Sequence, residues 1–505
     1  MNANLYALLR SHFPGDPSAP CLEPEDDGAV SYGDLDTGSA VISRLLGELD
    51  VEKGDRVVVQ ADKSPRAVLL YLACLRRGAV YVPLNPAYTP SEVFYFLSDS
   101  EPKLFVCTAA AAEELAPVAE AAGVPHLLTM DPAGDGTLAE ACAGLAPDPA
   151  VAATAADDLA AILYTSGTTG RSKGAMLSHR NLASNALALH RIWGWAPGDV
   201  LLHVLPIFHV HGLFVALHCA LLNGSPILFM PRFDAEGVLR LLPRATVMMG
   251  VPTFYTRLLE QPGLTPEISR GMRLFISGSA PLLEETFHAW ERRTGHRILE
   301  RYGMTEAGMI TSNPLEGERI AGTVGFPLPD VEARIADDRG KVLPPGETGI
   351  LEIRGPNVFK GYWRMPDKTA AEFRDDGFFI TGDLARMDAD GRVSIVGRAR
   401  DLIISGGFNV YPKEVELLID DIAGVGESAV FGVYHPDFGE AVAAAVTRSG
   451  AGGVTEAEIL EALSRRLARF KLPKRIYFVD ELPRNAMGKV QKNQLRDRYG
   501  DAFRT

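Results

Sequence analysis

The chain has 505 residues, 47% of them hydrophobic and 23% charged, which is enough for about two to four folding units with cores of their own. Lysine and arginine number 50 against 64 aspartates and glutamates, and this net charge of −14 argues against binding nucleic acid or an anionic membrane by bulk attraction. An anionic substrate must therefore be held by local groups.

The cysteines and the first residues bear on the compartment. Five scattered cysteines form no CxxC pair, which favours neither a disulfide framework nor a zinc site. The stretch 1–16 lacks a basic start followed by an apolar run, so no secretory signal is predicted. The longest apolar region, 213–230, contains His218 and Pro226 and is interpreted as a buried helix, a turn and a strand. A cytoplasmic location is expected.

Apolar strand-like runs alternate with helical segments from the start to about residue 145. Strands are expected at 56–60, 79–84 and 103–107, and helices at 67–77, 90–98 and 109–122. Buried strands separated by helices predict βαβ units and a mainly parallel sheet. A small-residue stretch with prolines at 147–158 is the predicted linker to the next segment.

The stretch 162–177, ILYTSGTTGRSKGAML, joins an apolar run to a loop rich in glycine and hydroxyl groups. Its glycines can turn the backbone N–H groups toward an anion, while its hydroxyls and its one lysine add further donors. The order Arg-Ser-Lys-Gly differs from the Gly-Lys-Ser/Thr of a P-loop. By itself the stretch is equally a solvated turn or a phosphate loop. The candidate phosphate ligands are Thr165, Ser166, Gly167, Thr168, Thr169 and Lys173.

Later segments continue the alternation and then change in texture. Strands expected at 200–206, 226–230, 246–252 and 272–278 each end in a Pro or Gly turn, where α/β sheets place ligands. Shorter β-like pieces, including 349–355 and 391–397, indicate a β-rich subdomain from about 321 to 398. The remaining residues alternate again, with a helix expected at 462–469, and predict a small α+β domain.

Six separated segments resemble, in the same order, the acyl-adenylate-forming (AMP-binding) superfamily of acyl-CoA synthetases, luciferases and peptide-synthetase adenylation domains. They are YTSGTTGRSKGAML (164–177), LPIFHVHG (205–212), ERYGMTE (300–306), ITGD (380–383), GRARDLIISGGFNVYPKEVE (397–416) and LPRNAMGKVQK (482–492). The resemblance implies an α/β fold with a large multi-part AMP-binding and acyl-binding domain over 1–398. A hinge would follow at 399–401, and a small mobile catalytic α+β domain over 402–505.

The resemblance also implies a two-step reaction. A carboxylate attacks the α-phosphorus of ATP to give an acyl-adenylate and pyrophosphate, and the thiol of coenzyme A then displaces AMP. Because two anions must meet, donors and a metal have to screen their repulsion. The implied metal is Mg²⁺, with Glu306 and Thr165 as its ligands, while the 165–173 loop wraps the triphosphate.

Other nucleotide contacts follow from the same motifs. Asp383 resembles the carboxylate that accepts both ribose hydroxyls, and Arg398 would support the same ribose. Lys489 resembles the catalytic lysine, whose flexible charge can stabilise the transition state at the α-phosphate. The remaining implied ATP and AMP contacts are Gly278, Ser279, Ala280, Glu300, Arg301, Tyr302, Gly303, Met304 and Thr305. For Ser279 and Ala280 a plain helix-entry turn is the alternative.

The C-terminal motifs imply a hinge and a coenzyme A contact. Gly406, Gly407 and Phe408 resemble the turn that meets the thiol tunnel after the C-terminal domain rotates. At the hinge, Arg400 is followed by Asp401, which leaves the pivot between these two residues.

Longer phrases, including GVPTFYTRLL, resemble the malonyl-CoA synthetase branch, which activates malonate and often methylmalonate. Arg257 lies in the part of that phrase placed along the acyl pocket, where a buried arginine would need an anion such as a second substrate carboxylate. The alternative is an ion pair with a protein carboxylate. The resemblance also places His209 and Ser279 at the acyl site, whereas His209 with His211 indicates a metal pair only weakly.

The expected partners are the small-molecule substrates, with no nucleic acid and no membrane, and the oligomeric state is not fixed by the sequence. Three alternatives remain. These are a synthetase for another short, medium-chain or aromatic acid, an adenylation domain that serves a carrier protein, and a nucleotide-binding regulator without catalysis. The chain ends soon after Lys489 with no carrier segment, which favours coenzyme A as the thiol.

Overall fold

The structure, a computed structural model, describes residues 2–25, 28–165, 172–405, 408–436, 438–449, 453–467, 469–485 and 488–503. The chain divides into two compact units. The N-terminal unit comprises residues 1–321, 325–332 and 354–379, and the C-terminal unit comprises residues 322–324, 333–353 and 380–505.

A six-stranded sheet forms the first part of the N-terminal unit, in the order β6-β5-β3-β4-β7-β8. Its strands are β3 (Arg56–Gln60), β4 (Val80–Pro83), β5 (Leu104–Cys107), β6 (His126–Thr129), β7 (Leu159–Thr165) and β8 (Lys173–Ser178). All neighbours pair in parallel except β7 and β8, which form an antiparallel hairpin. The apolar runs of β3 to β5 are buried, so the predicted βαβ units and mainly parallel sheet are confirmed.

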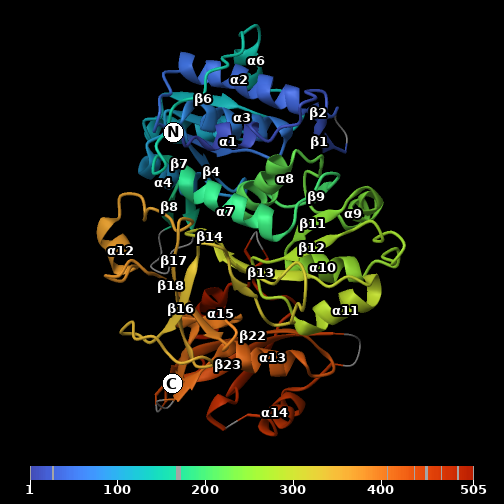
Figure 1. Ribbon diagram of the computed structural model, residues 1–505. Coiled ribbons are helices and arrows are strands. Elements are labelled where there is room, and N and C mark those ends of the chain that lie inside the picture. Colours follow the sequence, from blue (N-terminus) through green and yellow to red (C-terminus); the bar gives the residue numbers. More distant parts are fainter. Residues whose placement is uncertain are drawn as a thin grey trace. The chain divides into compact units, whose positions relative to one another are not determined.

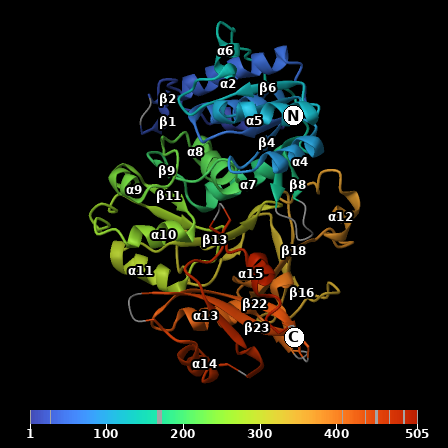
Figure 2. The same cartoon turned by 180° about the vertical axis from the view of Figure 1, so that it is seen from behind.

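The helices between these strands start and stop at ordinary capping signals. α3 (Pro65–Arg77) and α4 (Pro90–Ser100) each begin with a proline behind a hydroxyl residue, Ser64 or Thr89, whose oxygen accepts a backbone N–H of the first turn. α3 lies beside α2 (Figure 1), and α4 packs with α5, which is seen from behind in Figure 2. The other helices of this region are α1 (Leu5–Arg10), α2 (Tyr32–Glu48), α5 (Ala109–Ala121) and α6 (Thr137–Cys142).

A nine-stranded sheet forms the rest of the unit, in the order β15-β14-β13-β12-β11-β9-β10-β1-β2. Its strands are β1 (Pro20–Pro24), β2 (Val30–Ser31), β9 (Leu201–His203), β10 (Ile227–Phe229), β11 (Val247–Gly250), β12 (Leu274–Ser277), β13 (Leu299–Met304), β14 (Gly308–Ser312) and β15 (Phe326–Pro327). From β1 to β13 neighbours pair in parallel, whereas β2, β14 and β15 pair antiparallel. The carboxyl ends of β9, β11, β12 and β13 therefore lie along one edge.

Helices α9, α10 and α11 cover one face of this sheet and lie along β11 and β12, in green in Figure 1. Three aromatic rings in that layer, those of Tyr255, Phe275 and Trp290, pack edge to face. Aromatic pairs favour this arrangement. The helices of this half are α7 (His179–Ile192), the π-helix η1 (His211–Ala216), α8 (Leu217–Asn223), α9 (Ala235–Leu241), the short η2 (Leu242–Arg244), α10 (Pro252–Leu259), α11 (Glu284–Thr294) and α12 (Pro366–Ala371).

The apolar region 213–230 forms buried helix in η1 and α8, a left-handed turn at Gly224, and the strand β10, so that interpretation is confirmed. Of the helices in the described ranges, none has the length and apolar character needed to cross a membrane.

The C-terminal unit holds two further sheets. A four-stranded sheet contains, in order, β16 (Glu332–Ala336), β17 (Thr348–Arg354), β18 (Phe379–Met387) and β19 (Val393–Arg398). A five-stranded sheet contains β20 (Ile403–Ser405), β21 (Phe408–Val410), β22 (Val425–His435), β23 (Gly439–Arg448) and β24 (Arg475–Phe478). The predicted strands at 349–355 and 391–397 and the small α+β domain are confirmed.

Both faces of the five-stranded sheet are covered. Along β22, Val430 belongs to the core formed with α13 (Pro412–Asp420) and α14 (Glu456–Ser464). Its neighbours Ala429 and Phe431 belong to the core formed with α15 (Lys492–Tyr499), because successive strand residues point to opposite faces. The short helices η3 and η4 span Ala399–Asp401 and Arg469–Lys471.

The bounds predicted for the helix at 462–469 are wrong, because α14 covers Glu456–Ser464. Thr455 and Glu458 form a capping box that fixes its start. The division into units also groups residues 333–353 and 380–398 with the C-terminal residues. The hinge at 399–401 stays a prediction.

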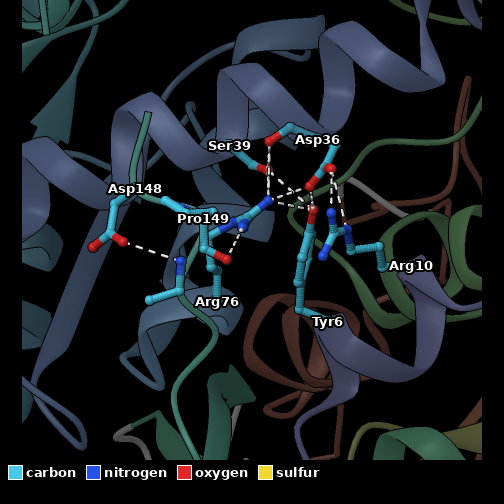
Figure 3. A network of polar contacts seen from close by, with 8 residues as sticks. Tyr6, Arg10, Asp36, Ser39, Arg76, Asp148 and Pro149 are labelled. Carbon is cyan, nitrogen blue, oxygen red and sulfur yellow. Dashed lines mark hydrogen bonds and ion pairs between the residues drawn. The ribbon is translucent and has the colours of Figure 1, made fainter. Parts of the chain in front are cut away.

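A polar network joins the first three helices of the N-terminal unit (Figure 3). Arg76 of α3 is 1% exposed and lies 4.3 Å from the Tyr6 ring centroid of α1. It donates hydrogen bonds to the carboxylate and to the backbone carbonyl of Asp36 in α2. Asp36 also accepts the Tyr6 hydroxyl at 2.5 Å and Arg10 Nε at 3.1 Å. One carboxylate thus serves three donors from two other helices.

The network changes the titration of its members. Burial, with the Asp36 hydrogen bond adding to it, raises the pKa of Tyr6 to about 12. Burial alone would raise the pKa of Asp36, but the hydrogen bonds from Tyr6 and Arg76 and the nearby arginine charges outweigh burial and hold that pKa below its usual value. A lowered carboxyl pKa stabilises the fold above the unfolded-state pKa, and this contribution is lost as pH falls through the folded-state pKa.

We predict that Arg76→Met lowers the free energy of unfolding by about 2 kcal/mol at pH 7, because it removes charged hydrogen bonds from Asp36. Urea unfolding followed by circular dichroism measures the loss. The difference in unfolding free energy between Arg76→Met and wild type should become smaller below about pH 4, where Asp36 becomes protonated.

The matched control is Arg44→Met, since Arg44 pairs with Glu48 on the exposed side of α2 and such pairs contribute little. Equal unfolding midpoints for the Arg76 and Arg44 variants at pH 7 would contradict the prediction.

Candidate active site

Residues at the carboxyl ends of the parallel strands meet in the N-terminal unit. Gly278 and Ser279 directly follow β12, and β12 pairs with β13 so that Ser277 lies opposite Glu300. Glu300 is 6% exposed, and its Oε1 accepts the Leu282 N–H at 3.1 Å. The other predicted nucleotide residues in this part are the half-buried Ala280, the β13 residues Arg301, Tyr302, Gly303 and Met304, and Thr305 in the turn that follows.

Arg301 is a buried cation at this edge. It is 2% exposed, and its Nε and Nη2 atoms have no hydrogen-bond partner among the described residues. A Cβ atom at Gly278 would lie 2.3 Å from the guanidinium, so only glycine allows Arg301 this place. Burial lowers the pKa of Arg301 to about 9. The charge of the neighbouring Glu300 offsets part of the cost of burial, and the two donors that it leaves unpaired among the described residues suit an anion supplied by a ligand.

Ser279 and His211 face each other beside Arg301. Ser279 has a φ of 71°, a left-handed conformation that is strained for a residue with a side chain. Its Oγ lies 3.2 Å from Nδ1 of His211, which is 1% exposed. Burial, together with the charges of Arg301, His209 and His203, lowers the pKa of His211 well below its usual value, so the ring is neutral at pH 7.

The His211 Nε2 atom is buried and has no hydrogen-bond partner in the described part of the chain. Sequence reasoning considered His211 only as half of a weak metal pair. Within the described ranges, no group of three or more His, Cys, Asp or Glu side chains is arranged to hold a metal. The HVHG segment, with a second histidine just before a glycine, was the signal that could have marked His211.

His209 and Arg257, the predicted acyl-site residues, lie after β9 and β11. His209 is half-buried. The expectation that Arg257 is buried is wrong, because its side chain is exposed. Arg257 lies in the last turn of α10, whose buried residues are Tyr255 and Leu258, so the arginine points off the packed face.

The hairpin β7–β8 holds the two ends of the predicted phosphate loop. Thr165 pairs with Lys173, and the Thr165 hydroxyl lies 3.4 Å from the Lys173 carbonyl. The other predicted loop residues, Ser166, Gly167, Thr168 and Thr169, lie outside the described residues.

Lys173 and Glu306 are linked by an aromatic residue. The Lys173 ammonium lies 4.1 Å from the Tyr362 ring centroid and 3.7 Å from the Glu372 carboxylate. Tyr362 donates its hydroxyl to Glu306 Oε1 at 3.0 Å, and Glu306 is 7% exposed. Tyr362 and Glu372 were not found from the sequence, because they lie almost two hundred residues from the loop.

The donors present suit Mg²⁺. This ion usually takes one or two carboxylates and keeps waters and substrate phosphates as its other ligands. Glu306 is a buried carboxylate whose orientation is fixed by Tyr362, and Thr165 offers a hydroxyl at the start of the loop. The residues therefore fit the metal that the sequence predicted.

The predicted ribose residues are neighbours in the C-terminal unit. Asp383 of β18 lies opposite Arg398 of β19, and Arg398 Nε is 2.6 Å from its carboxylate. Asp383 is 3% exposed, and its N–H donates to the Thr381 hydroxyl. The carboxylate is thus held rigidly, as a bidentate acceptor must be.

Lys489 also lies in the C-terminal unit and is half-buried. Its N–H donates to the Asn485 side chain and its carbonyl accepts the Asn485 N–H, both at 3.0 Å, so these two hydrogen bonds hold its backbone. At the predicted hinge, Asp401 accepts a hydrogen bond from Arg496 at 2.6 Å, and Arg400 lies in the same short helix.

The predicted coenzyme A turn is described only in part. Gly406 and Gly407 lie outside the described residues, and the backbone of Phe408 pairs with Ser405 across β20 and β21.

Comparison with known proteins places these features in a family. The AMP-binding enzyme model matches residues 10–363, and the AMP-binding enzyme C-terminal domain model matches residues 414–489. A malonate–CoA ligase of Arabidopsis thaliana is 35% identical over 93% of this chain and 85% of its own length. A feruloyl-CoA synthase of Amycolatopsis is also 35% identical, over 94% of each chain. ATP-bound MatB from Rhodopseudomonas palustris is 53% identical and superposes with a TM-score of 0.98 over all of both chains.

We predict that Tyr362→Phe weakens ATP·Mg²⁺ binding about five- to tenfold, because Glu306 loses the hydrogen bond that orients it. Calorimetric titration with ATP at several Mg²⁺ concentrations measures the change.

Tyr477→Phe is the control, since its ring stacks on Tyr499 in the C-terminal unit. If both variants bind ATP as wild type does, Tyr362 has no part in the site.

Proposed function

Because the chain belongs to the AMP-binding enzyme family, we propose that it ligates malonate to coenzyme A through a malonyl-adenylate. It is an acid–thiol ligase that uses ATP and coenzyme A as co-substrates and Mg²⁺ as cofactor, and its partners are small molecules. A carboxylate oxygen of malonate bonds to the α-phosphorus as the bond to pyrophosphate breaks. The thiolate then bonds to the acyl carbon as the bond to AMP breaks.

The observation that carries the choice of a dicarboxylic acid is Arg301. Its guanidinium is buried beside Ser279 and His211 at the ends of the strands, and two of its donors have no partner within the described ranges. Each unsatisfied buried donor costs about 1 to 3 kcal/mol, so a ligand carboxylate there is strongly favoured. One carboxylate of the acid reacts with ATP. Only a dicarboxylic acid therefore has a second carboxylate left to bind Arg301. The exposed Arg257, in the last turn of α10, is a second cation for the same acid.

An aromatic monocarboxylic acid is the second candidate, since the feruloyl-CoA synthase is as similar as the malonate–CoA ligase. Such an acid would bring no second charge to Arg301. Malonate therefore fits the buried cation better, with methylmalonate as the acid that differs by one methyl group.

The nucleotide residues take the following roles in the proposal. Glu306 and Thr165 hold Mg²⁺, which when bound neutralises phosphate charge. Lys173 restrains the triphosphate, Asp383 with its partner Arg398 accepts the ribose hydroxyls, and Lys489 stabilises the charge that builds at the α-phosphate.

We also propose a cytoplasmic location. The support is that all five cysteines are unpaired thiols and four are buried, as in a reducing compartment.

We predict that wild type has a kcat/KM for malonate at least about a hundredfold above that for butyrate. Arg301→Lys should lower the malonate value about tenfold and leave butyrate unchanged, because lysine keeps the charge but loses the planar fork. Arg257→Ala should lower the malonate value by a smaller factor, as expected for an exposed cation. Thioester formation with a panel of mono- and dicarboxylic acids measures all of these values.

Arg273→Lys is the control, since Arg273 forms its fork with Asp199 inside the protein. If acetate or butyrate is a better substrate than malonate for wild type, the dicarboxylate proposal is wrong.

We predict that Lys489→Ala slows adenylation about a thousandfold while the Kd for ATP stays within about twofold, because its charge acts in the transition state. Lys173→Ala should instead weaken ATP binding about tenfold. ATP–pyrophosphate exchange and calorimetry separate the two effects.

Lys492→Ala removes the same charge three residues further on, where Lys492 pairs with Glu416, and serves as the control. An equal loss of ATP affinity in the Lys489 and Lys173 variants contradicts this division of roles.

A further inference from the structure

A lysine and a histidine are buried in the N-terminal unit behind the acid site, the proposed binding site formed by Arg301, Ser279 and His211. Lys63 follows β3 and is 9% exposed, and its ammonium lies 2.8 Å from both Nδ1 and the carbonyl oxygen of His203. The ammonium is also 4.3 Å from the ring centroid of Phe229. Burial lowers the pKa of Lys63 well below its usual value, and within the described ranges no carboxylate forms an ion pair with it.

The contacts of His203 define its tautomer. Its Nε2 lies 3.0 Å from the carbonyl oxygen of Gly212, which can only accept, so Nε2 carries the proton. Nδ1 is then the acceptor for Lys63. A chain of two hydrogen bonds therefore runs from Lys63 through His203 to the backbone at Gly212.

Gly212 lies where the backbone departs from an α-helix. It is the second residue of the π-helix η1, and its carbonyl accepts the N–H of Leu217, five residues on. Such wide turns are uncommon and need support from their surroundings. The histidine gives the same carbonyl a second donor, and a Cβ at Gly212 would lie 2.0 Å from the Pro206 carbonyl oxygen, so the turn is pinned on two sides.

The pinned turn carries the two histidines of the acid site. His211 directly precedes Gly212 and faces Ser279 at 3.2 Å, and the carbonyl of His209 accepts the N–H of Leu213 in the first turn. A change in the direction of the Gly212 carbonyl would therefore move the His211 ring relative to Ser279.

We propose that Lys63 and His203 are positioning residues that hold the start of η1 and thereby place His211 in the acid-binding site. This inference rests on the proposed function only in naming the acid. A lysine that served packing alone would be replaced by an apolar side chain without effect on the pocket, whereas a positioning pair acts on binding of the acid and spares binding of ATP.

The test uses the full-length enzyme and three variants. His203→Leu removes the donor to Gly212, His203→Gln restores an N–H near the place of Nε2, and Lys63→Met removes the donor to Nδ1 with little change in volume. We expect His203→Leu to raise the KM for malonate about tenfold, as for one buried hydrogen bond, with the KM for ATP unchanged within about twofold. His203→Gln should recover most of the loss, and Lys63→Met should fall between.

A second measurement needs no substrate. Hydrogen exchange of peptides covering residues 205–220 reports the Leu217 N–H, and we expect faster exchange there in His203→Leu and protection in His203→Gln. His218→Leu is the control, because His218 is equally buried in α8 but bonds to Tyr71.

The results of these experiments distinguish a failure of the proposed function from a failure of the positioning role of Lys63 and His203. If wild type rejects malonate, the proposed function fails, and the same comparison with its best acid still tests the positioning pair. If His203→Leu does not fold, Lys63→Met carries the test. Equal losses for malonate and ATP, no recovery with His203→Gln, or lower stability with an unchanged KM for the acid would each overturn the inference.

Discussion

Parallel pairing of β9, β11, β12 and β13 is the constraint on which the N-terminal unit depends. Parallel neighbours in register end at the same edge, so the residues that follow each strand arrive together although up to about a hundred positions separate them in the chain. Ser279 after β12 and His211 after β9 meet in this way. No local signal around either residue dictates that contact, because the sheet alone brings them within reach of each other.

Two buried cations at this edge are stabilised in different ways. Lys63 donates hydrogen bonds to an imidazole and a carbonyl, so the protein itself supplies most of its hydrogen-bond acceptors. Nε and Nη2 of Arg301 have no hydrogen-bond partner among the residues that the structure describes. Leaving each of these donors unsatisfied costs about 1 to 3 kcal/mol, which exceeds the roughly 1 kcal/mol that an exposed ion pair contributes at most. In the proposed function, the larger share of acid recognition therefore belongs to Arg301 and a smaller one to the exposed Arg257.

Much of the fold follows from the sequence, because buried parallel strands are continuous apolar runs; β3 matches its expected bounds at both ends. The pairing of Asp383 with Arg398 fits the short antiparallel hairpin that joins their motifs. Contacts between distant segments had no such signal, as Tyr362 with Glu306 shows. The exposure of Arg257 was open to inference, since the apolar Tyr255 and Leu258 already mark the packed face of α10.

Ser279 pays for its position with backbone strain, since its φ of 71° is one that glycine adopts at little cost. A glycine there would relieve the strain and at the same time delete the oxygen that faces His211. In the proposed function, stability therefore favours glycine at position 279, whereas binding of the substrate favours serine. Selection for heat resistance alone would be expected to favour glycine at this position, whereas selection for the proposed activity would favour serine.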